Sequence, residues 1–453
     1  MIEDWDFAEA KTDYMTHGFH IYPARMIPQV AERLIIKFYK PSLRSKLILD
    51  PFCGSGGVLV EAILKDIDAI GIDLNPLACL LARVKTTPIE PDRLYSTFMK
   101  IWNGIKTEGF KKDWIEIQKM LVEAMKLKNN DEKAMILKEV KIKCENLEVE
   151  IPDISNTNLF YWFKPNVIKD LLIVKKYLSK IQNEDEKNFF NVCFSATIRA
   201  VSGTRKGEFK LYRMPLEEWE RFNPNVFETF RNRVLDNISK MAEFFNAMKN
   251  KKAKAYVFEF DTRDLFSKKC PIDLSRLLKE NSVNLIVTSP PYGDSHTTVA
   301  YGQFSRYSLV WLGYRKEDIW GIDDKSLGGI KKEEEIESES LKDILKKIKK
   351  KSRVEEVKSF FIDLKICLEK LSKLLTNDGH ACFVLGNRTV NGWRIPTDEI
   401  LIELSRPFGL KHIKTYYRNI PSKRIPWKSS PTNISGQKVE TINKESIVIL
   451  RKT

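Results

Sequence analysis

The 453-residue sequence has no uninterrupted run of eighteen apolar residues, the length at which a segment becomes a candidate membrane-spanning helix. Residues 1–6 are acidic and lack the basic and apolar stretches of a signal peptide. Hydrophobic residues make up 43% of the chain and charged residues 30%, which is usual for a soluble globular protein. We therefore expect a soluble chain that is long enough to bury a large core and to form two or more lobes.

The cysteines also lack a pattern that would give them a chemical role. There are seven, scattered along the chain, and none belongs to a Cys-x-x-Cys pair. This spacing predicts neither a zinc site nor a disulfide framework, so we expect no metal. An odd number of cysteines fits the reducing cytoplasm, where a buried thiol packs as a small apolar group.

Acidic residues are fewer than basic ones, 61 against 76, which gives a formal net charge of +15. A basic surplus of this size is typical of a protein that binds a polyanion such as nucleic acid. A protein that acts on small metabolites has no need of it. The alternative is a lysine-rich proteome or a hot habitat, which would raise lysine and glutamate together.

The sequence contains a glycine-rich turn but not the common nucleotide-binding fingerprints. An apolar segment at 46–49 predicts a strand, the turn Asp50-Pro51-Phe52-Cys53-Gly54-Ser55-Gly56-Gly57 follows, and 58–64 has the pattern of a helix. Glycines let a ligand approach the backbone, and the start of a helix offers free N–H groups. Neither Gly-x-Gly-x-x-Gly nor Gly-Lys-Ser/Thr is present, which counts against a dinucleotide or phosphate loop. Asp50 ends the strand, where its carboxylate can meet a cationic group.

About twenty residues later, Asp73 ends a second predicted strand, a position from which an acid accepts hydrogen bonds from ribose hydroxyls.

A second motif follows the apolar run 283–288, which predicts a buried strand. The tetrapeptide Ser289-Pro290-Pro291-Tyr292 must leave the sheet, because two consecutive prolines cannot continue a hydrogen-bonded ladder. Open α/β sheets bind their ligands at this carboxyl edge. The hydroxyl and carbonyl oxygens can accept hydrogen bonds from a planar amine while the ring stacks on it. Taken alone, the motif is equally compatible with a rigid turn.

Together these segments resemble the S-adenosylmethionine-dependent amino-methyltransferases, which methylate exocyclic nitrogens of nucleobases. Blocks in the family's order carry the resemblance: 17–28, 50–56, 71–76, 260–265 and 289–292. The first resembles the segment that packs against the methionine end of the cofactor, and the block at 260–265 resembles the loop that holds the adenine edge. The cofactor-binding residues that the resemblance implies are Tyr22, Pro23, Asp50, Phe52, Gly54, Gly56, Asp73 and Asp261. One departure is Gly57, since many members of the family have threonine there.

The resemblance implies an α/β fold with a Rossmann-like class I methyltransferase sheet, mostly parallel and closed by a terminal antiparallel hairpin. The first part of the cofactor-binding domain is expected at 1–91 and the second part at 251–453, with a charged linker at about 331–353 and the hairpin formed by 411–417 and 445–450. A mainly helical lobe is inserted at 92–250, and it is the candidate for target recognition.

The catalytic residues implied are Ser289, Pro290, Pro291 and Tyr292. Ser289 and the carbonyl of Pro290 would accept the two amine hydrogens, and Tyr292 would stack on a base flipped out of the duplex, with no need for a metal. Members with serine at the first position mostly methylate cytosine N4, and those with aspartate mostly adenine N6. The resemblance thus implies a site-specific cytosine-N4 methyltransferase acting on double-stranded DNA in a restriction–modification system, beside a separate cognate endonuclease. The alternatives are an RNA base methyltransferase, an adenine-N6 enzyme, or a binding protein without catalysis.

The inserted lobe contains one segment suited to nucleic acid, 199–213, in which basic and aromatic residues alternate around two glycines. Such a loop can contact phosphates and base edges, although a basic surface turn has the same composition. The candidate contact residues are Arg205, Lys206, Lys210 and Arg213, together with Arg306 from the polar segment after the catalytic motif. The C-terminal segment 418–438 is a second candidate.

Overall fold

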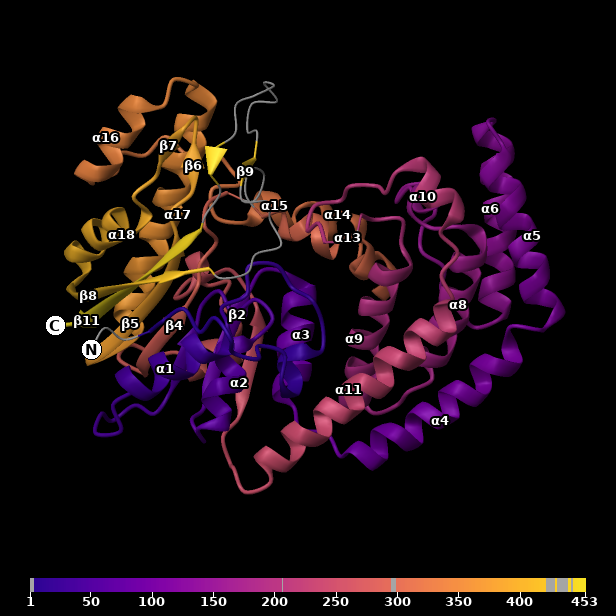
Figure 1. Ribbon diagram of the computed structural model, residues 1–453, viewed down its shortest axis with the longest axis horizontal. Coiled ribbons are helices and arrows are strands. Elements are labelled where there is room, and N and C mark those ends of the chain that lie inside the picture. Colours follow the sequence, from indigo (N-terminus) through magenta and orange to yellow (C-terminus); the bar gives the residue numbers. More distant parts are fainter. Residues whose placement is uncertain (1–3, 206, 295–298, 421–427, 430–438, 441–442) are drawn as a thin grey trace.

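The computed structural model describes residues 4–205, 207–294, 299–420, 428–429, 439–440 and 443–453. Its main feature is a seven-stranded sheet in the order β3-β2-β1-β4-β5-β11-β8 (Figure 1). Neighbouring strands are parallel from β3 to β5, whereas β11 is antiparallel to both β5 and β8. The strands are β1 (Ile48–Asp50), β2 (Ala69–Asp73), β3 (Ala255–Glu259), β4 (Val283–Thr288), β5 (Leu375–Gly386), β8 (Leu410–Asn419) and β11 (Lys444–Lys452). This confirms the expected mostly parallel sheet with antiparallel terminal strands.

The strand order explains where the polar loops meet. β1 pairs with β2 on one side and with β4 on the other, so the chain reverses its direction of travel across the sheet between β1 and β4. Ligands of open parallel sheets bind at such a switch point, beyond the carboxyl ends of the strands. Every residue of β4 is buried, as expected for a central strand covered on both faces. The turn after β1 and the loop after β4 therefore emerge side by side.

Helices cover both faces of the sheet. α1 (Pro28–Phe38) and α2 (Gly57–Leu64) share one apolar core with the sheet, in which Leu34 and Leu59 lie on the side of β4 that carries Leu285. On the other face, α17 (Lys351–Leu374) and α18 (Thr397–Ser405) pack Leu364 and Leu401 into a second core. The result is a three-layer arrangement in which alternate side chains of each strand enter different cores.

The chain between α3 (Pro76–Thr86) and β3 is mainly helical, and in Figure 1 it lies on the far side of α3 from the sheet. Its helices are α4 (Pro91–Glu108), α5 (Lys112–Lys126), α6 (Asn130–Asn146), α7 (Leu159–Trp162), α8 (Pro165–Ser179), α9 (Glu184–Val201), α10 (Leu216–Arg221) and α11 (Val226–Met248). Most of them share a continuous apolar core with α3 and with α13 (Tyr301–Leu312), the helix that follows the catalytic motif. Trp311 of α13 makes edge contacts with Phe163 and Phe194. The helical segment is therefore packed directly onto the element that continues from the Ser-Pro-Pro-Tyr motif.

Shorter elements complete the structure. The helices are α12 (Ile272–Leu277), α14 (Lys316–Trp320), α15 (Ile322–Lys325) and α16 (Glu339–Lys347), with single turns η1 (Met15–Gly18), η2 (Thr262–Asp264) and η3 (Arg406–Phe408). The small strands are β6 (Thr389–Val390), β7 (Trp393–Arg394), β9 (Lys428–Ser429) and β10 (Val439–Glu440). Within the described ranges, none of the helices combines the length and the apolar composition needed to cross a bilayer.

One expectation from the sequence is refined, and one turn-like sequence lies within a strand. The segment 331–353 is not simply a charged linker, because it contains α16, whose Leu341 and Ile344 are buried against α18. Apolar residues at helical spacing lie between the charges and fix this helix. The turn signal Asn377-Asp378-Gly379 lies inside β5, where Asp378 has a φ of 64° and the pairing of β5 with β4 shifts register. A local irregularity therefore accommodates these residues without ending the strand.

Candidate active site

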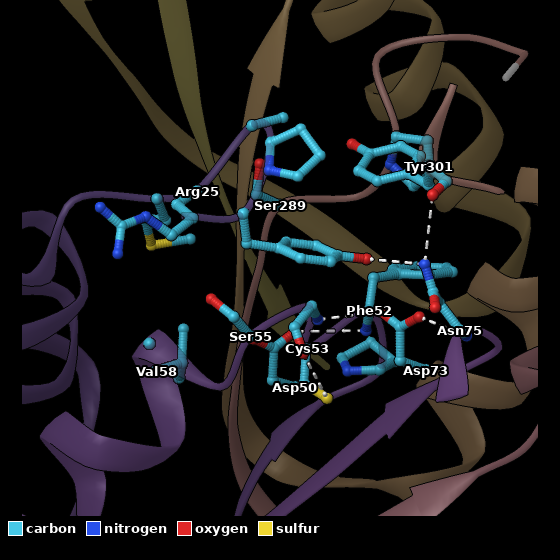
Figure 2. A pocket seen from close by; sticks show the side chains of 18 of the residues that line it. Arg25, Asp50, Phe52, Cys53, Ser55, Val58, Asp73, Asn75, Ser289 and Tyr301 are labelled. Atoms are coloured by element: carbon cyan, nitrogen blue, oxygen red, sulfur yellow. Dashed lines mark hydrogen bonds between the residues drawn. The ribbon is translucent and has the colours of Figure 1, made fainter. Parts of the chain in front are cut away.

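A cavity lies at the carboxyl ends of β1, β2, β3 and β4 (Figure 2). Each segment of the family resemblance contributes to its wall. The predicted residues that line it are Tyr22, Pro23, Asp50, Phe52, Gly54, Asp73, Asp261, Ser289 and Pro291. Residues far apart in the sequence thus meet at one edge of the sheet.

Three predicted residues do not line the cavity. Gly56 precedes α2 with a φ of 80°, and a side chain there would come within 2.8 Å of the Cα of Ala82 in α3. The glycine therefore lets α2 begin close to α3. Pro290 is buried behind the loop. The third residue, Tyr292, donates from its hydroxyl to Oε1 of Glu445, at 2.6 Å, on the side of β11.

Asp50 is a buried carboxylate at the end of β1. Its Oδ1 accepts hydrogen bonds from the hydroxyl of Thr288, at 2.6 Å, and from the backbone N–H of Phe52, at 3.2 Å. Burial raises the pKa of Asp50 to about 7, more than these hydrogen bonds lower it. Among the residues that the structure describes, no lysine, arginine or histidine forms an ion pair with it. Asp50 is thus suited to a cationic group of a ligand.

Asp73 links the end of β2 to the glycine-rich turn. Its Oδ2 accepts the N–H of Gly54 at 2.9 Å, and its Oδ1 accepts the N–H of Asn75 at 2.8 Å. Burial raises the pKa of Asp73 to about 6 in spite of these hydrogen bonds. The carboxylate thereby fixes the turn and remains at the wall of the cavity.

Asn75 is a residue that the sequence analysis missed. Its side-chain amide donates to Ser305 Oγ at 2.7 Å and to the hydroxyl of Tyr22 at 3.2 Å, while its Oδ1 caps α3 at the N–H of Leu77. It therefore joins the N-terminal segment, β2 and α13 around the cavity, as Figure 2 shows for Asn75 and Tyr301. The Asn-Pro pair at the helix start was the available signal, since asparagine is a preferred N-cap.

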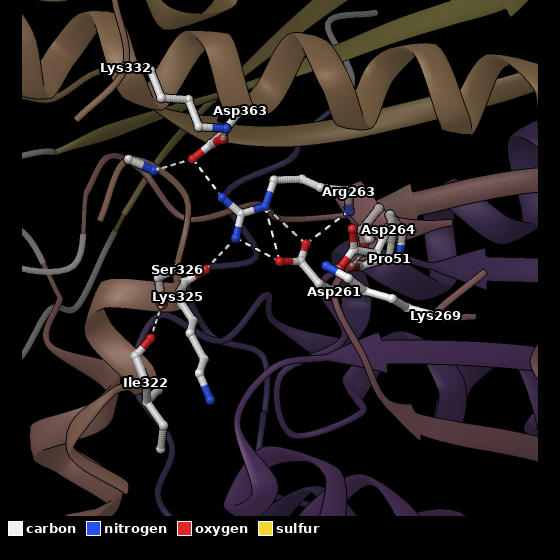
Figure 3. A network of polar contacts seen from close by, with 12 residues as sticks. Pro51, Asp261, Arg263, Asp264, Lys269, Ile322, Lys325, Ser326, Lys332 and Asp363 are labelled. Atoms are coloured by element: carbon white, nitrogen blue, oxygen red, sulfur yellow. Dashed lines mark hydrogen bonds and ion pairs between the residues drawn. The ribbon is translucent and has the colours of Figure 1, made fainter. Parts of the chain in front are cut away.

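Asp261 is held in a network of ion pairs (Figure 3). The guanidinium of Arg263 binds both carboxylate oxygens of Asp261, and its NH1 reaches Asp363 of α17 at 2.7 Å. Asp363 is fully buried and also pairs with Lys332. The hydroxyl of Thr262 donates to the carbonyl of Pro51 at 2.7 Å. These contacts lock the loop after β3 against the glycine-rich turn, where it forms the cavity wall.

The Ser-Pro-Pro-Tyr motif is held from both ends. Ser289 is half-buried at the cavity, and its Oγ lies 3.3 Å from the hydroxyl of Tyr292. Glu445, which accepts from Tyr292, is in turn paired with Arg418 of β8. Two residues beyond the motif, Asp294 forms a buried ion pair with Arg388, with Oδ2 and NH1 at 2.7 Å. The terminal strands and the segment after β5 therefore set the path of the loop.

The candidate nucleic-acid residues are not equivalent. Arg205 is exposed and Lys210 half-buried in a loop closed by a bridge between Thr204 and Arg213. The guanidinium of Arg213 lies over the rings of Tyr161 and Trp219, 4.2 and 4.8 Å from their centroids. Arg306, on α13, lies over Trp320 at 4.7 Å. Lys206 and most of the C-terminal candidate segment lie outside the described residues. α13, which carries Arg306, packs against the loop of the other candidates, because Phe209 contacts Phe304 and the N–H of Leu211 donates to Gln303.

Comparison with known proteins gives a family match. The family model described as DNA methylase matches residues 5–83, which include the N-terminal segment, the glycine-rich turn and β2. The type II methyltransferase M.MvaI of Kocuria varians is 35% identical over 458 residues, covering 98% of this chain and 93% of that protein. The type II methyltransferase M.MjaII of Methanocaldococcus jannaschii is 25% identical, covering 77% of this chain and 72% of that protein.

Solved structures match less closely. TTHA0409 of Thermus thermophilus, a putative DNA modification methylase complexed with S-adenosyl-L-methionine, is 19% identical with a TM-score of 0.17, covering 22% of this chain and 40% of that one. The rRNA methyltransferase aviRa of Streptomyces viridochromogenes is 9% identical with a TM-score of 0.31, covering 96% and 88% of the two chains. At these TM-scores neither structure bears on the site.

The identity to M.MvaI spans nearly the whole of both chains, so the similarity extends across the sheet, the cavity and the helical segment. The cavity also fits S-adenosylmethionine, the cofactor of the DNA methylases, because the buried carboxylate of Asp50 suits an ammonium group and the half-buried carboxylate of Asp73 suits ribose hydroxyls. The chain therefore belongs to the family of type II methyltransferases, S-adenosylmethionine-dependent DNA methylases of restriction–modification systems.

Proposed function

We propose that the protein methylates the exocyclic N4 of cytosine within a short sequence of double-stranded DNA. The observation that carries this proposal is Ser289, the head of the Ser-Pro-Pro-Tyr motif, which lies at the wall of the cofactor cavity directly after β4. Serine at this position is the form of the motif that is associated with cytosine N4 in the family. A type II relative that matches nearly the whole chain supports a DNA target.

The cofactor supplies an electrophilic methyl group, so the protein has only to bind it and to prepare the amine. An exocyclic amine is planar because its lone pair is delocalised into the ring. The hydroxyl of Ser289 and the carbonyl of Pro290 accept its two hydrogens and aim the lone pair toward the cavity. Since positive charge develops on the nitrogen, acceptors placed there stabilise the transition state more than the ground state.

The target base has to leave the duplex to reach this loop, which costs about a few kcal/mol. Tyr292 is the aromatic residue proposed to stack on the flipped base. Its hydroxyl is bound by Glu445, so its ring is oriented by β11 rather than free to rotate. The helical segment between α3 and β3, with its basic loop at Arg205 and Lys210, is the proposed target-recognition lobe.

The product of the reaction tests the proposal. Incubating the protein with plasmid DNA and labelled S-adenosylmethionine, followed by digestion to nucleosides, should give labelled N4-methylcytosine. The same assay with total RNA should give no label above background. N6-methyladenine as the DNA product, or label in RNA alone, would show that the base or the polymer is wrong. Heat-inactivated protein provides the blank.

A second prediction concerns the pH dependence of cofactor affinity. We assign Asp50 to the α-ammonium group of S-adenosylmethionine, which it binds only when ionised. Because its pKa is raised to about 7, affinity should increase as the pH rises through about 7. It should decrease again once the ligand's own α-amino group loses its proton, at roughly pH 8.

Calorimetric titration with S-adenosylmethionine across this pH range measures the effect. In Asp50→Asn the step near pH 7 should vanish and the affinity at pH 7.5 should fall by about tenfold, the cost of one charge-assisted hydrogen bond. A step due to Asp73 should remain at lower pH, because burial raises its pKa to about 6. An unchanged step in Asp50→Asn would assign the titration to another group.

A further inference from the structure

Lys85 is a buried lysine on α3. The apolar pattern of the helix does not explain why a charged residue is buried there. Only 1% of its surface is exposed, although its side chain lines the cofactor cavity. Its Nζ donates one hydrogen bond, to the hydroxyl of Ser55 at 3.0 Å. Among the described residues no aspartate or glutamate pairs with it. A buried cation without an anionic partner is costly, so proteins rarely keep one unless a ligand supplies the partner.

The surroundings of Lys85 are those of an anion site. Ser55 lies in the glycine-rich turn, two residues before α2, whose first N–H groups are free of intrahelical partners. Position 57, where many members of the family have threonine, is glycine, and an added Cβ there would meet only the carbonyl of Met26, at 3.8 Å. The space beside the start of the helix is therefore open to a ligand. Burial, and then the nearby charge of Arg25, lowers the pKa of Lys85, and an anion bound beside Nζ would favour the charged form again.

The position of this site along the cavity identifies the ligand group. In Figure 2 Arg25, Ser55 and Val58 lie at one side, Asp73, Asn75 and Tyr301 lie at the other, and Asp50 lies between them. Asp73 takes the ribose in the proposed function. The amino-acid end of the cofactor then extends past Asp50 toward Ser55 and Lys85. That end is a zwitterion, and the cavity offers one buried acid and one buried base to match it.

We propose that Lys85, with Ser55, binds the α-carboxylate of the methionine part of S-adenosylmethionine. This assignment rests on the proposed function in one respect, the placing of the cofactor in this cavity. It adds to the proposed function the residue that recognises one end of that cofactor. Lys85 is a binding residue and takes no part in the transfer of the methyl group.

Two ligands that differ by one group test this inference. Decarboxylated S-adenosylmethionine keeps the sulfonium and the amine but lacks the carboxylate. In the unaltered protein, calorimetric titration without DNA should show S-adenosylmethionine binding on the order of 100-fold more tightly than the decarboxylated ligand, as expected for a charge-assisted contact in a buried site. Equal affinities would overturn the assignment, whatever the behaviour of any variant.

The variant Lys85→Met keeps the apolar stem and removes the charge. It should lose most of this preference, because S-adenosylmethionine binds about 100-fold less tightly while the decarboxylated ligand binds as before. An equal loss for both ligands would mean that Lys85 only maintains the shape of the cavity, and no loss for either would remove it from the site. Arg83→Met is the matched control, since Arg83 is an exposed cation two residues away on α3, and it should leave both affinities unchanged.

These measurements involve no nucleic acid, so they are independent of the base that is methylated. A DNA product of N6-methyladenine would overturn the proposed function and leave the Lys85 site standing. Equal affinities for the two ligands would overturn the Lys85 site and leave the proposed function standing.

Discussion

Replacing Ser289 with alanine should lower the rate of methyl transfer by about 100-fold to 1000-fold, the usual loss when one preorganised transition-state hydrogen bond is removed. The affinity for S-adenosylmethionine should remain close to that of the unaltered protein. In the proposed function the hydroxyl acts on the amine as positive charge develops on it, and not on the cofactor, so the two effects should separate. Ser289 is half-buried, so removing its hydroxyl leaves a small space beside Tyr292 and no cavity in the core.

Single-turnover transfer of labelled methyl groups to DNA, with protein in excess, measures the chemical step without product release. Cofactor affinity is measured separately by calorimetry. Ser275→Ala is the matched control, because that hydroxyl is exposed on α12 and donates only to the carbonyl of Ile272. Turnover in Ser289→Ala equal to that in the control would remove Ser289 from the catalytic role.

Breaking the ion pair between Asp294 and Arg388 should strongly destabilise the protein. Asp294→Asn leaves the guanidinium of Arg388 buried without its carboxylate, which typically costs about 3–5 kcal/mol of unfolding free energy. The side chains are only 1% and 7% exposed, so water compensates little. Because Asp294 lies two residues beyond Tyr292, transfer should also fall as the catalytic motif loses one of its anchors.

Denaturant unfolding followed by tryptophan fluorescence measures this change. The double variant Asp294→Asn with Arg388→Met should lose less than the sum of the two single losses, since it removes both charges of the pair together. Asp318→Asn serves as the control, because its partner Arg315 is 79% exposed and such surface pairs contribute little. Strict additivity of the two single variants would show that the pair is not energetically coupled.

Much of the fold could be predicted because its signals are local. β4 coincides with the apolar run 283–288, β1 overlaps the segment expected at 46–49, and β2 ends at Asp73 as expected. Short parallel strands covered on both faces have continuous apolar sequences, which are visible without a structure. The helical content of the segment after α3 was likewise expected, since its periodicity is that of amphipathic helices.

Contacts between distant parts of the chain could not be predicted in the same way. The charges of 331–353 indicated a linker, although Leu341 and Ile344 hold α16 against α18. Arg213 and Arg306 were chosen for their charge, and the structure shows each stacked on an aromatic ring. A guanidinium packed in this way contributes to the protein's own packing, which composition alone does not reveal.

The sequence by itself determined the reaction class of this protein. Asp50, Asp73 and Ser289 follow predicted strands in an order that resembles one family, and the relatives confirm that the chain is a type II methyltransferase. Only the tertiary structure decided how the site is built around those motifs. It brought Lys85 of α3 to Ser55, and it placed Tyr292 in hydrogen-bond contact with Glu445 on β11, near the C-terminus. A motif is a run of neighbouring residues, which local sequence can display, whereas a buried charge finds its partner across the fold, where only the packing of the whole chain determines which residues meet.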